Sequence, residues 1–148
     1  MPFDVFVAPL HCPGCGATVA DAEIQTYIRN GVADGSGLRV GFELHAADLE
    51  SEHLVSAGYS LVAEPPADGP IRLLDVWSCP QCQTEQWAVV EMADRKIRSI
   101  KAVKLDRPTL ESANFISEVN ADLLAEALRG KESAKGENSV EILRRRLP

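Results

Sequence analysis

The chain has 148 residues, of which 45% are hydrophobic and 25% are charged. This balance excludes disordered and fibrous proteins and fits one ordinary globular domain. No apolar run approaches the roughly 20 residues that a membrane-spanning helix needs, and the start of the chain lacks the basic region of a signal peptide. We therefore expect a cytoplasmic protein, in which cysteines are more often metal ligands or catalytic thiols than disulfides.

The net charge of −7 is unevenly distributed along the chain. Residues 1–75 contain 11 acidic and 3 basic side chains, whereas residues 76–148 contain 11 acidic and 12 basic ones. An acidic surface repels phosphate backbones and attracts basic proteins, although it also serves simply to keep a protein in solution. The acidic residues that we select for partner binding are Asp48, Glu50 and Glu52. With His45 and His53 they could instead form an acid-base or metal cluster, but a solvated acidic face is the simpler interpretation.

The first elements combine one clear strand with one ambiguous segment. Residues 3–8 are apolar and β-branched, which predicts a short strand that leads into the first cysteine pair. Residues 17–30 fit either a helix or a strand, and the spacing of their apolar residues slightly favours a helix that Gly31 ends. Residues 38–45 alternate between apolar and polar side chains, which predicts a half-buried strand. Its apolar face would consist of Leu38, Val40, Phe42 and Leu44.

The middle of the chain reads as a helical turn followed by a series of strands. Residues 46–58 predict a short helical turn that ends at Gly58, and residues 59–63 predict a strand before a loop rich in proline and glycine. Strands are then expected at 71–77, 85–92 and 97–105, with the second cysteine pair and a tight turn between them. Pro108 ends this series.

Two helices are predicted near the end of the chain. Residues 114–130 show helical spacing, with an apolar stripe and Gly130 as the stop. The stripe consists of Ile116, Val119, Leu123 and Ala127, with Leu124 and Leu128 beside it. After a polar linker at 131–137, Asn138 and Glu141 stand in capping-box spacing ahead of a short helix. Val140, Leu143 and Leu147 would share one face of that helix.

Two cysteine pairs carry the clearest chemical signal. The stretches HCPGCG and SCPQCQ place Cys12 with Cys15 and Cys79 with Cys82. A C-x-x-C turn lets two sulfurs approach one ion, so two such turns supply the four thiolates of a closed, tetrahedral zinc site. Such a site leaves no open position for a catalytic water. We therefore predict one structural Zn²⁺ bound by these four cysteines.

The two pairs and the strands beside them resemble the knuckles and hairpin of a zinc ribbon. The resemblance covers about a third of the chain and departs from the usual pattern at two points. The gap between Cys15 and Cys79 is 63 residues, whereas about 15–20 are usual. In addition, Gln83 stands where the first knuckle has Gly16, which supplies the positive φ that such a turn commonly needs.

Other interpretations of the cysteines remain open. A redox dithiol lies at the start of a helix, and residues 17–30 could be that helix, but the second pair would then be unexplained. Disulfides and uninvolved buried thiols are further alternatives. His11, next to Cys12, is the one histidine placed to interfere with a metal.

Basic residues cluster on the last predicted strand and suggest nucleic acid as an alternative partner. The residues concerned are Arg95, Arg98, Lys101 and Lys104. Zinc ribbons often belong to transcription or replication proteins, but the acidic total and the scarcity of aromatic residues oppose that function here. Trp77 and Trp87 flank the second knuckle and are better explained as core residues. The chain contains no nucleophile elbow, Walker loop or dinucleotide motif.

Taken together, the sequence predicts an α+β fold. A zinc-ribbon-like antiparallel sheet would carry an αβ insertion between the knuckles, with helices after them. Residues 1–130 would form the domain, and residues 131–148 a polar linker and a short helix. We expect a non-enzymatic, acidic protein-interaction module, for example an immunity-type inhibitor that neutralises a basic partner. The alternatives are a nucleic-acid-associated zinc ribbon and, third, a thiol redox protein.

Overall fold

The computed structural model describes residues 3–29, 31–129 and 137–148, which form an α+β fold as predicted. The strands are β1 (Asp4–His11), β2 (Thr18–Thr26), β3 (Gly37–Leu38), β4 (Tyr59–Leu61), β5 (Ile71–Ser78), β6 (Glu85–Ala93), β7 (Lys96–Val103) and β8 (Phe115–Ser117). The helices are α1 (Ser51–Ser56), α2 (Arg107–Ser112), α3 (Glu118–Leu128) and α4 (Ser139–Arg146), with a 3₁₀ helix η1 (Ala46–Leu49) before α1. No helix in the described ranges is both long and apolar enough to cross a lipid bilayer.

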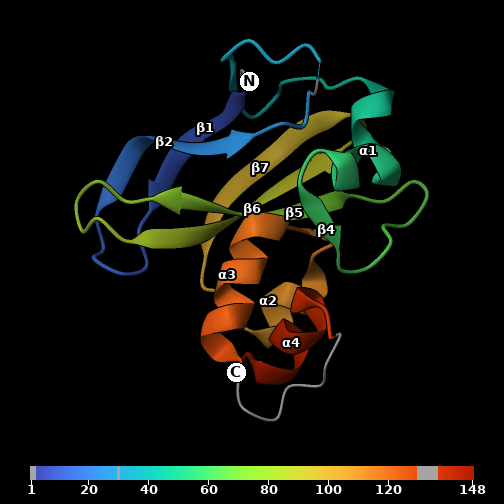
Figure 1. Cartoon of the computed structure of the whole chain (residues 1–148). Coiled ribbons are helices and arrows are strands. Elements are labelled where there is room, and N and C mark those ends of the chain that lie inside the picture. Colours follow the sequence, from blue (N-terminus) through green and yellow to red (C-terminus); the bar gives the residue numbers. More distant parts are fainter. Residues whose placement is uncertain (1–2, 30, 130–136) are drawn as a thin grey trace.

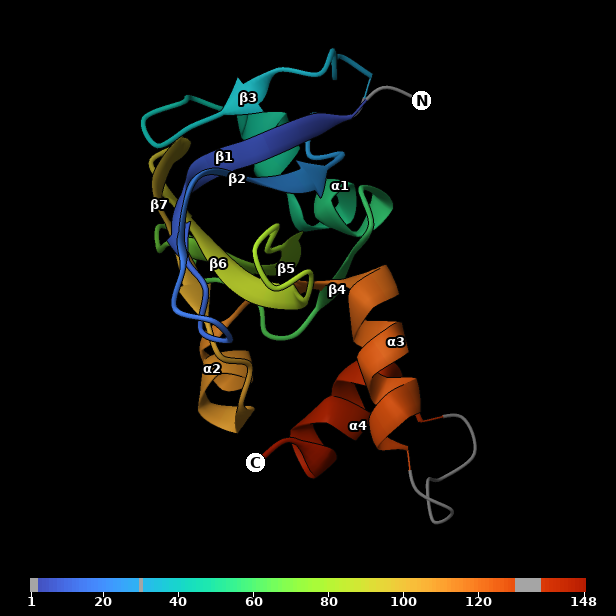
Figure 2. The ribbon, with the colours of Figure 1, turned by 90° about the vertical axis from the view of Figure 1, so that its left-hand side faces the viewer.

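The strands form two sheets rather than one. The smaller sheet has the order β2-β1-β3, and the larger has the order β4-β8-β5-β6-β7. Most neighbours are antiparallel, but β3 runs parallel to β1 and β8 runs parallel to β5. Figure 2 shows the smaller sheet above the larger one, with α2, α3 and α4 below. The larger sheet therefore lies between the smaller sheet and these helices.

Each face of the larger sheet buries its own apolar cluster. Phe6 and Ile24 of the smaller sheet pack with Leu73 and Val90 of the larger one between the two sheets. On the opposite face, Leu74 packs with residues of the helices. The helical residues at the centre of that cluster are Leu110, Ala121, Ala125 and Leu143. β5 contributes Leu73 and Trp77 to one cluster and Leu74 to the other, as expected for a strand covered on both sides.

The two cysteine pairs occupy the tips of two hairpins. β1 and β2 pair antiparallel from Asp4 opposite Thr26 to His11 opposite Thr18, with the first pair in the turn. β5 and β6 pair antiparallel from Ile71 opposite Met92 to Ser78 opposite Glu85, with the second pair in the turn. Both tips project to the same side of the molecule (Figure 1). The predicted hairpin of residues 85–105 is also confirmed, as β6 and β7.

The helix favoured for residues 17–30 is wrong, because this segment contains strand β2. Ala22, Ile24 and Thr26 are buried, whereas the residues between them are exposed, which is the period of two that a half-buried strand shows. Apolar residues at helical spacing are present, but residues 18–26 pair with β1 along one edge of the strand. A tertiary partner therefore overrides the local preference.

The strand predicted at residues 38–45 is also largely wrong. Only Gly37 and Leu38 pair with β1, after which the chain turns. Gly41 has a φ of 96°, outside the range of a strand, and Val40 is 56% exposed. The predicted apolar face is broken at this turn, although Leu38 and Leu44 are both buried.

The helical prediction for residues 114–130 needs two corrections. Residues 115–117 form strand β8, and the helix begins only at Glu118. Moreover, the predicted stripe faces solvent in part, because Val119 is 68% exposed and Leu123 is 64% exposed. The face that packs on the core instead centres on Ala121 and Ala125, whose small side chains let α3 approach its neighbours closely. Their low hydrophobicity hid this face in the sequence.

Helix α4 is confirmed, and helix α2 was not predicted. Asn138 caps α4 by accepting a hydrogen bond from the Glu141 N–H at 2.9 Å. Asp106 caps α2 by accepting from the Thr109 N–H at 2.9 Å, with Pro108 in the first turn. This Asp-x-Pro pattern is typical of a helix start, so Pro108 begins a helix as well as ending the series of strands. Except for Glu137, the predicted linker at 131–137 lies outside the described residues.

Asp4 holds the start of β1 against the loop that follows β2. It is fully buried and accepts hydrogen bonds from Arg29 Nε at 2.8 Å and Arg29 Nη2 at 2.9 Å. The N–H groups of Asp34 and Ser36 also donate to it. Burial alone would raise the pKa of Asp4, but these hydrogen bonds outweigh it and hold the pKa below its usual 3.8. The stabilisation is therefore present above about pH 4 and is lost as the pH falls further.

We predict that Leu143→Ala lowers the free energy of unfolding by about 2–5 kcal/mol, because it empties a fully buried position between α4 and the rest of the core. Leu123→Ala on α3 is the matched control and should change the stability by less than about 0.5 kcal/mol, since that side chain is exposed. Denaturant unfolding measures both variants. A small effect at Leu143 would contradict the docking of α4.

Candidate metal centre

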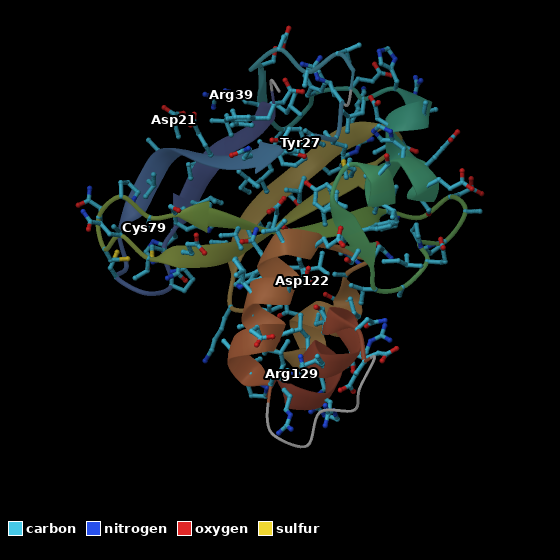
Figure 3. All side chains as sticks on the ribbon, in the orientation of Figure 1. Asp21, Tyr27, Arg39, Cys79, Asp122 and Arg129 are labelled. Carbon is cyan, nitrogen blue, oxygen red and sulfur yellow. The ribbon has the colours of Figure 1, made fainter. Side chains whose placement is uncertain are left out.

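The two hairpin tips bring all four cysteine sulfurs together. The Sγ atoms of Cys12, Cys15, Cys79 and Cys82 lie within 4.8 Å of one another. The distance is 3.8 Å between Cys12 and Cys82, and 3.7 Å between Cys15 and Cys79. A tetrahedron with Zn–S bonds of about 2.3 Å has S–S edges of about 3.8 Å. The donors therefore fit a single Zn²⁺ in number, chemistry and spacing. Figure 3 shows these sulfurs at the hairpin tips, near the label of Cys79.

The two knuckles share the same backbone geometry. In the first, the Gly16 N–H donates to the Cys12 carbonyl at 2.9 Å, and the Cys12 N–H donates to the Ala17 carbonyl at 2.8 Å. In the second, the Gln83 N–H donates to the Cys79 carbonyl at 2.8 Å, and the Cys79 N–H donates to the Thr84 carbonyl at 2.9 Å. Each knuckle thus offers its two sulfurs from an equivalent turn, despite the difference in sequence.

Gln83 resolves the doubt that the second knuckle raised. Its φ is 55°, and that of Gly16 is 77°, so both residues take the left-handed conformation. Glycine adopts this conformation freely, whereas a glutamine does so at a cost. The knuckle turn therefore imposes its geometry on a residue that does not favour it, because the hydrogen bond to Cys79 and the position of Cys82 depend on it.

The electrostatics of the site call for a cation. The side-chain hydroxyl of Thr84 is the main cause that lowers the pKa of Cys82 to about 6. The Thr84 N–H and the thiols of Cys12 and Cys15 act in the same direction, and burial opposes them. For Cys15, the Ala17 N–H lowers the pKa, but burial and the three neighbouring sulfurs outweigh it and raise the pKa to about 11. The sulfurs are too close together for all of them to ionise unaided. A divalent ion supplies the positive charge that lets four thiolates coexist.

The geometry argues against the two other interpretations of the cysteines. A redox dithiol needs a helix behind the pair to lower the thiol pKa through its dipole, but strands β2 and β6 follow the two pairs. A disulfide needs sulfurs about 2.05 Å apart, and all four cysteines are free. His11 is exposed and hydrogen-bonds to Thr18 at 3.3 Å, so it lies beside the sulfur cluster without joining it.

The acidic residues selected for a partner lie far from the sulfurs, around η1 and α1. Glu50 and Glu52 are exposed, but Asp48 is buried and accepts from the His45 N–H at 3.2 Å. The Nε2 atom of His53 lies 3.9 Å from Asp48 and 2.6 Å from the carbonyl of Ile28. These contacts hold α1 against the end of the first hairpin, so Asp48 and His53 have a structural part here.

The basic residues selected for nucleic acid lie on and around β7, which is an edge strand. Arg95 pairs with Glu43 at 2.7 Å, and Arg98 pairs with Asp94 at 3.2 Å. Lys101 and Lys104 are exposed. Trp77 is buried between the sheets, where its Nε1–H donates to the Trp87 carbonyl at 3.3 Å, and Trp87 packs on the other cluster. Both tryptophans therefore belong to the core, as expected.

A second group of polar residues was not selected from the sequence. Asp75 on β5 is 6% exposed, and its carboxylate accepts from the Tyr59 hydroxyl at 2.9 Å and the Val76 N–H at 2.8 Å. The Tyr59 hydroxyl also lies 2.8 Å from Thr26 Oγ1, so the network joins β2, β4 and β5. Its signal in the sequence is the one acidic residue inside the apolar run IRLLDVW, on the same strand face as Leu73 and Trp77.

Burial dominates the titration of this network. It raises the pKa of Asp75 to about 6, although hydrogen bonds from Val76, Tyr59 and Ser117 act in the opposite direction. Burial, together with the charge of Asp75, raises the pKa of Tyr59 well above its usual 10. The tyrosine therefore remains a hydrogen-bond donor throughout the physiological range.

Comparison with known protein families, with curated proteins and with solved structures finds no match for this chain. The resemblance to a zinc ribbon therefore rests on the four-cysteine cluster alone, which is consistent with a metal site of that kind.

We predict that the purified chain contains one zinc ion per molecule and that a chelator unfolds it, because the ion holds together two hairpins from different sheets. Cys79→Ser should lose most of the zinc and be strongly destabilised. Gln83→Gly is the control and should keep the zinc, since glycine adopts the same backbone conformation. Elemental analysis and circular dichroism measure these effects. Much less than one zinc per chain, or a Cys79→Ser variant as stable as the native chain, would contradict the site.

We predict that Asp75→Asn gains stability relative to the native chain as the pH rises. The raised pKa of Asp75 means that folding takes up a proton between about pH 4 and pH 6, so the native chain loses stability across this range. For a shift from 3.8 to about 6, the change is on the order of 3 kcal/mol. The asparagine variant lacks this loss. Denaturant unfolding at pH 4 and pH 7.5 measures it, and a difference between the proteins that is independent of pH would contradict the assignment.

Proposed function

We propose that this chain is a zinc-stabilised protein-interaction module whose partner is a basic protein. More narrowly, we propose that it is an inhibitor that neutralises this partner, as an immunity protein neutralises a toxin. The observation that carries the proposal is the arrangement of the four sulfurs at tetrahedral spacing. Four thiolates complete the coordination of Zn²⁺ and leave no position for a substrate or a water molecule. The role of the ion is then to hold a binding surface in shape.

The charge distribution supports a basic protein as the partner. Residues 1–75 carry 11 acidic and only 3 basic side chains, and all three of these arginines are in ion pairs with acidic residues. The surface of this half thus has a surplus of carboxylates, which would accelerate the approach of a positively charged protein. Glu50 and Glu52 project from this half and are exposed.

A nucleic-acid partner has less support. Arg95 and Arg98 each already pair with a carboxylate of this chain, so only Lys101 and Lys104 of the selected residues remain to meet phosphates. Two cations make a weak site, and the binding that they supply would fall steeply as salt is added.

We predict that the zinc-loaded chain captures a basic protein from a lysate of its native organism, and that the association rate of the purified pair falls as salt is added. The double variant Glu50→Lys, Glu52→Lys should lower the on-rate more than it raises the off-rate. Glu111→Lys on α2 is the matched control and should leave the on-rate nearly unchanged, since it is exposed on the opposite side of the larger sheet. Stopped-flow or surface plasmon resonance measures the rates.

The contrary outcome concerns mixed DNA and RNA. Tight binding of these at physiological salt, abolished by Lys101→Ala with Lys104→Ala and accompanied by no captured protein, would overturn the proposal in favour of a nucleic-acid-associated module.

A further inference from the structure

A cleft of about 660 Å³ lies between β2 of the smaller sheet and β5 of the larger one. Its volume is within the range of sites that enclose a drug-sized ligand and far exceeds that of one side chain. Tyr59, Asp75 and Thr26 form part of its wall, and Ser117 and Val119 at the start of α3 close one side. Asp21 on β2 and Tyr27, which follows the last residue of β2, also line the cleft, and both are labelled in Figure 3.

The strands on either side have backbone edges that are not covered by another strand. Within the described residues, β2 pairs with β1 alone, so its opposite edge is open. β5 pairs with β8 only at Leu73 and Leu74, and the stretch from Val76 to Ser78 continues past Ser117, the last residue of β8, although the Val76 N–H is already bonded to Asp75. Open strand edges present unpaired N–H and C=O groups, which an extended chain segment can use.

The charge of the cleft has one sign. Its charged lining residues are Asp21, Glu23, Asp75 and Glu85, and no lysine or arginine is among its lining residues. Asp21 is paired with Arg39 at the rim, where both side chains are exposed. Asp75 is different, because it is buried and bonded only to neutral donors. Among the ion pairs of the described residues, none includes Asp75.

A buried carboxylate without a cation is costly to the fold unless something else compensates it. The Tyr59 hydroxyl and the Val76 N–H supply hydrogen bonds, but they supply no net charge. A cationic side chain that enters the cleft from outside would provide the missing charge. The acidic residues at the rim would attract it, and the apolar side chains of Val19, Val76 and Val119 would contact its aliphatic stem.

We propose that this cleft receives a short basic segment of the protein partner, with a lysine or arginine side chain placed next to Asp75. This inference rests on the proposed function, because it names the surface that the basic partner occupies. Asp75 is the counter-ion, Glu23 and Glu85 attract the segment at the rim, and the open edge of β2 runs beside the segment's backbone. The four-cysteine cluster lies at the tips of the hairpins that contain these two strands.

The test measures how well the zinc-loaded full chain retains pools of hexapeptides. In each pool one position carries a fixed residue and the other positions are randomised. Pools with a fixed lysine or arginine should be retained at least about tenfold better than pools with a fixed citrulline, which keeps the length and removes the charge. Asp75→Asn and the double variant Glu23→Gln, Glu85→Gln should each abolish this difference. Glu111→Gln on α2 is the control and should retain it.

Two measurements keep the result independent of folding and of ligand size. Each variant must have the native zinc content and a cooperative unfolding transition at least as stable as that of the native chain. The exposed double variant carries the test if Asp75→Asn fails this check. Nα-acetyl-lysine methylamide and putrescine should bind much more weakly than the best peptide. Either small amine binding as tightly would assign the cleft to a small molecule and overturn the proposal.

The outcomes separate this inference from the proposed function. If a basic protein is captured from the lysate but binds Asp75→Asn and the double variant as well as the native chain, the cleft assignment is wrong and the proposed function stands. If the basic pools show no preference over citrulline, the cleft assignment is also wrong. If the pools behave as expected but no basic protein is captured, the cleft binds cations and the proposed function fails.

Discussion

The arrangement of the two sheets depends on the contact of four cysteine sulfurs at two hairpin tips, where a divalent cation would relieve the mutual repulsion of the thiolates. Each hairpin tip carries two sulfurs, and neither tip completes a site alone. A cation bound there would join segments that are 63 residues apart in the chain, and the entropic cost of closing so long a loop grows only slowly with its length. The apolar cluster between the sheets holds the rest of the two hairpins together, and the sulfur cluster holds their tips.

This arrangement differs from a single ribbon in a way that matters for function. In this chain the knuckles belong to different sheets, so a metal bound there would connect the two sheets at one end only. The residues between the knuckles supply β3, η1, α1 and β4, and β4 carries Tyr59, which links β2 to β5 through Thr26 and Asp75. A polar network thus bridges the sheets in addition to the sulfur site.

The sequence allowed the local features to be predicted, and tertiary contacts decided the rest. The knuckles follow from C-x-x-C spacing, and the hairpin of β6 and β7 follows from alternation and a tight turn, because both are properties of a few adjacent residues. Residues 17–30 satisfied two periodicities, and only the presence of β1 as a partner selects the strand. The buried face of α3 could not be seen because it consists of Ala121 and Ala125, while Val119 and Leu123 drew the prediction to the wrong side. The environment of Asp75 depends on Tyr59 and Thr26, which come from other strands.

The strands that flank the cleft are the same strands that carry the knuckles, since β2 leaves the first tip and β5 enters the second. A small rotation of one hairpin relative to the other would therefore change the width of the cleft and the spacing of the sulfurs together. The cleft and the sulfur cluster would then both depend on the orientation of one hairpin relative to the other. A ligand that stabilises one orientation at either site would change the geometry of both. Binding in the cleft and binding of zinc would then be linked, and each would change the affinity for the other by the same factor. Although a metal ion bound by four cysteines has no position for a substrate, the rate at which it exchanges with free zinc would then depend on whether the cleft is occupied.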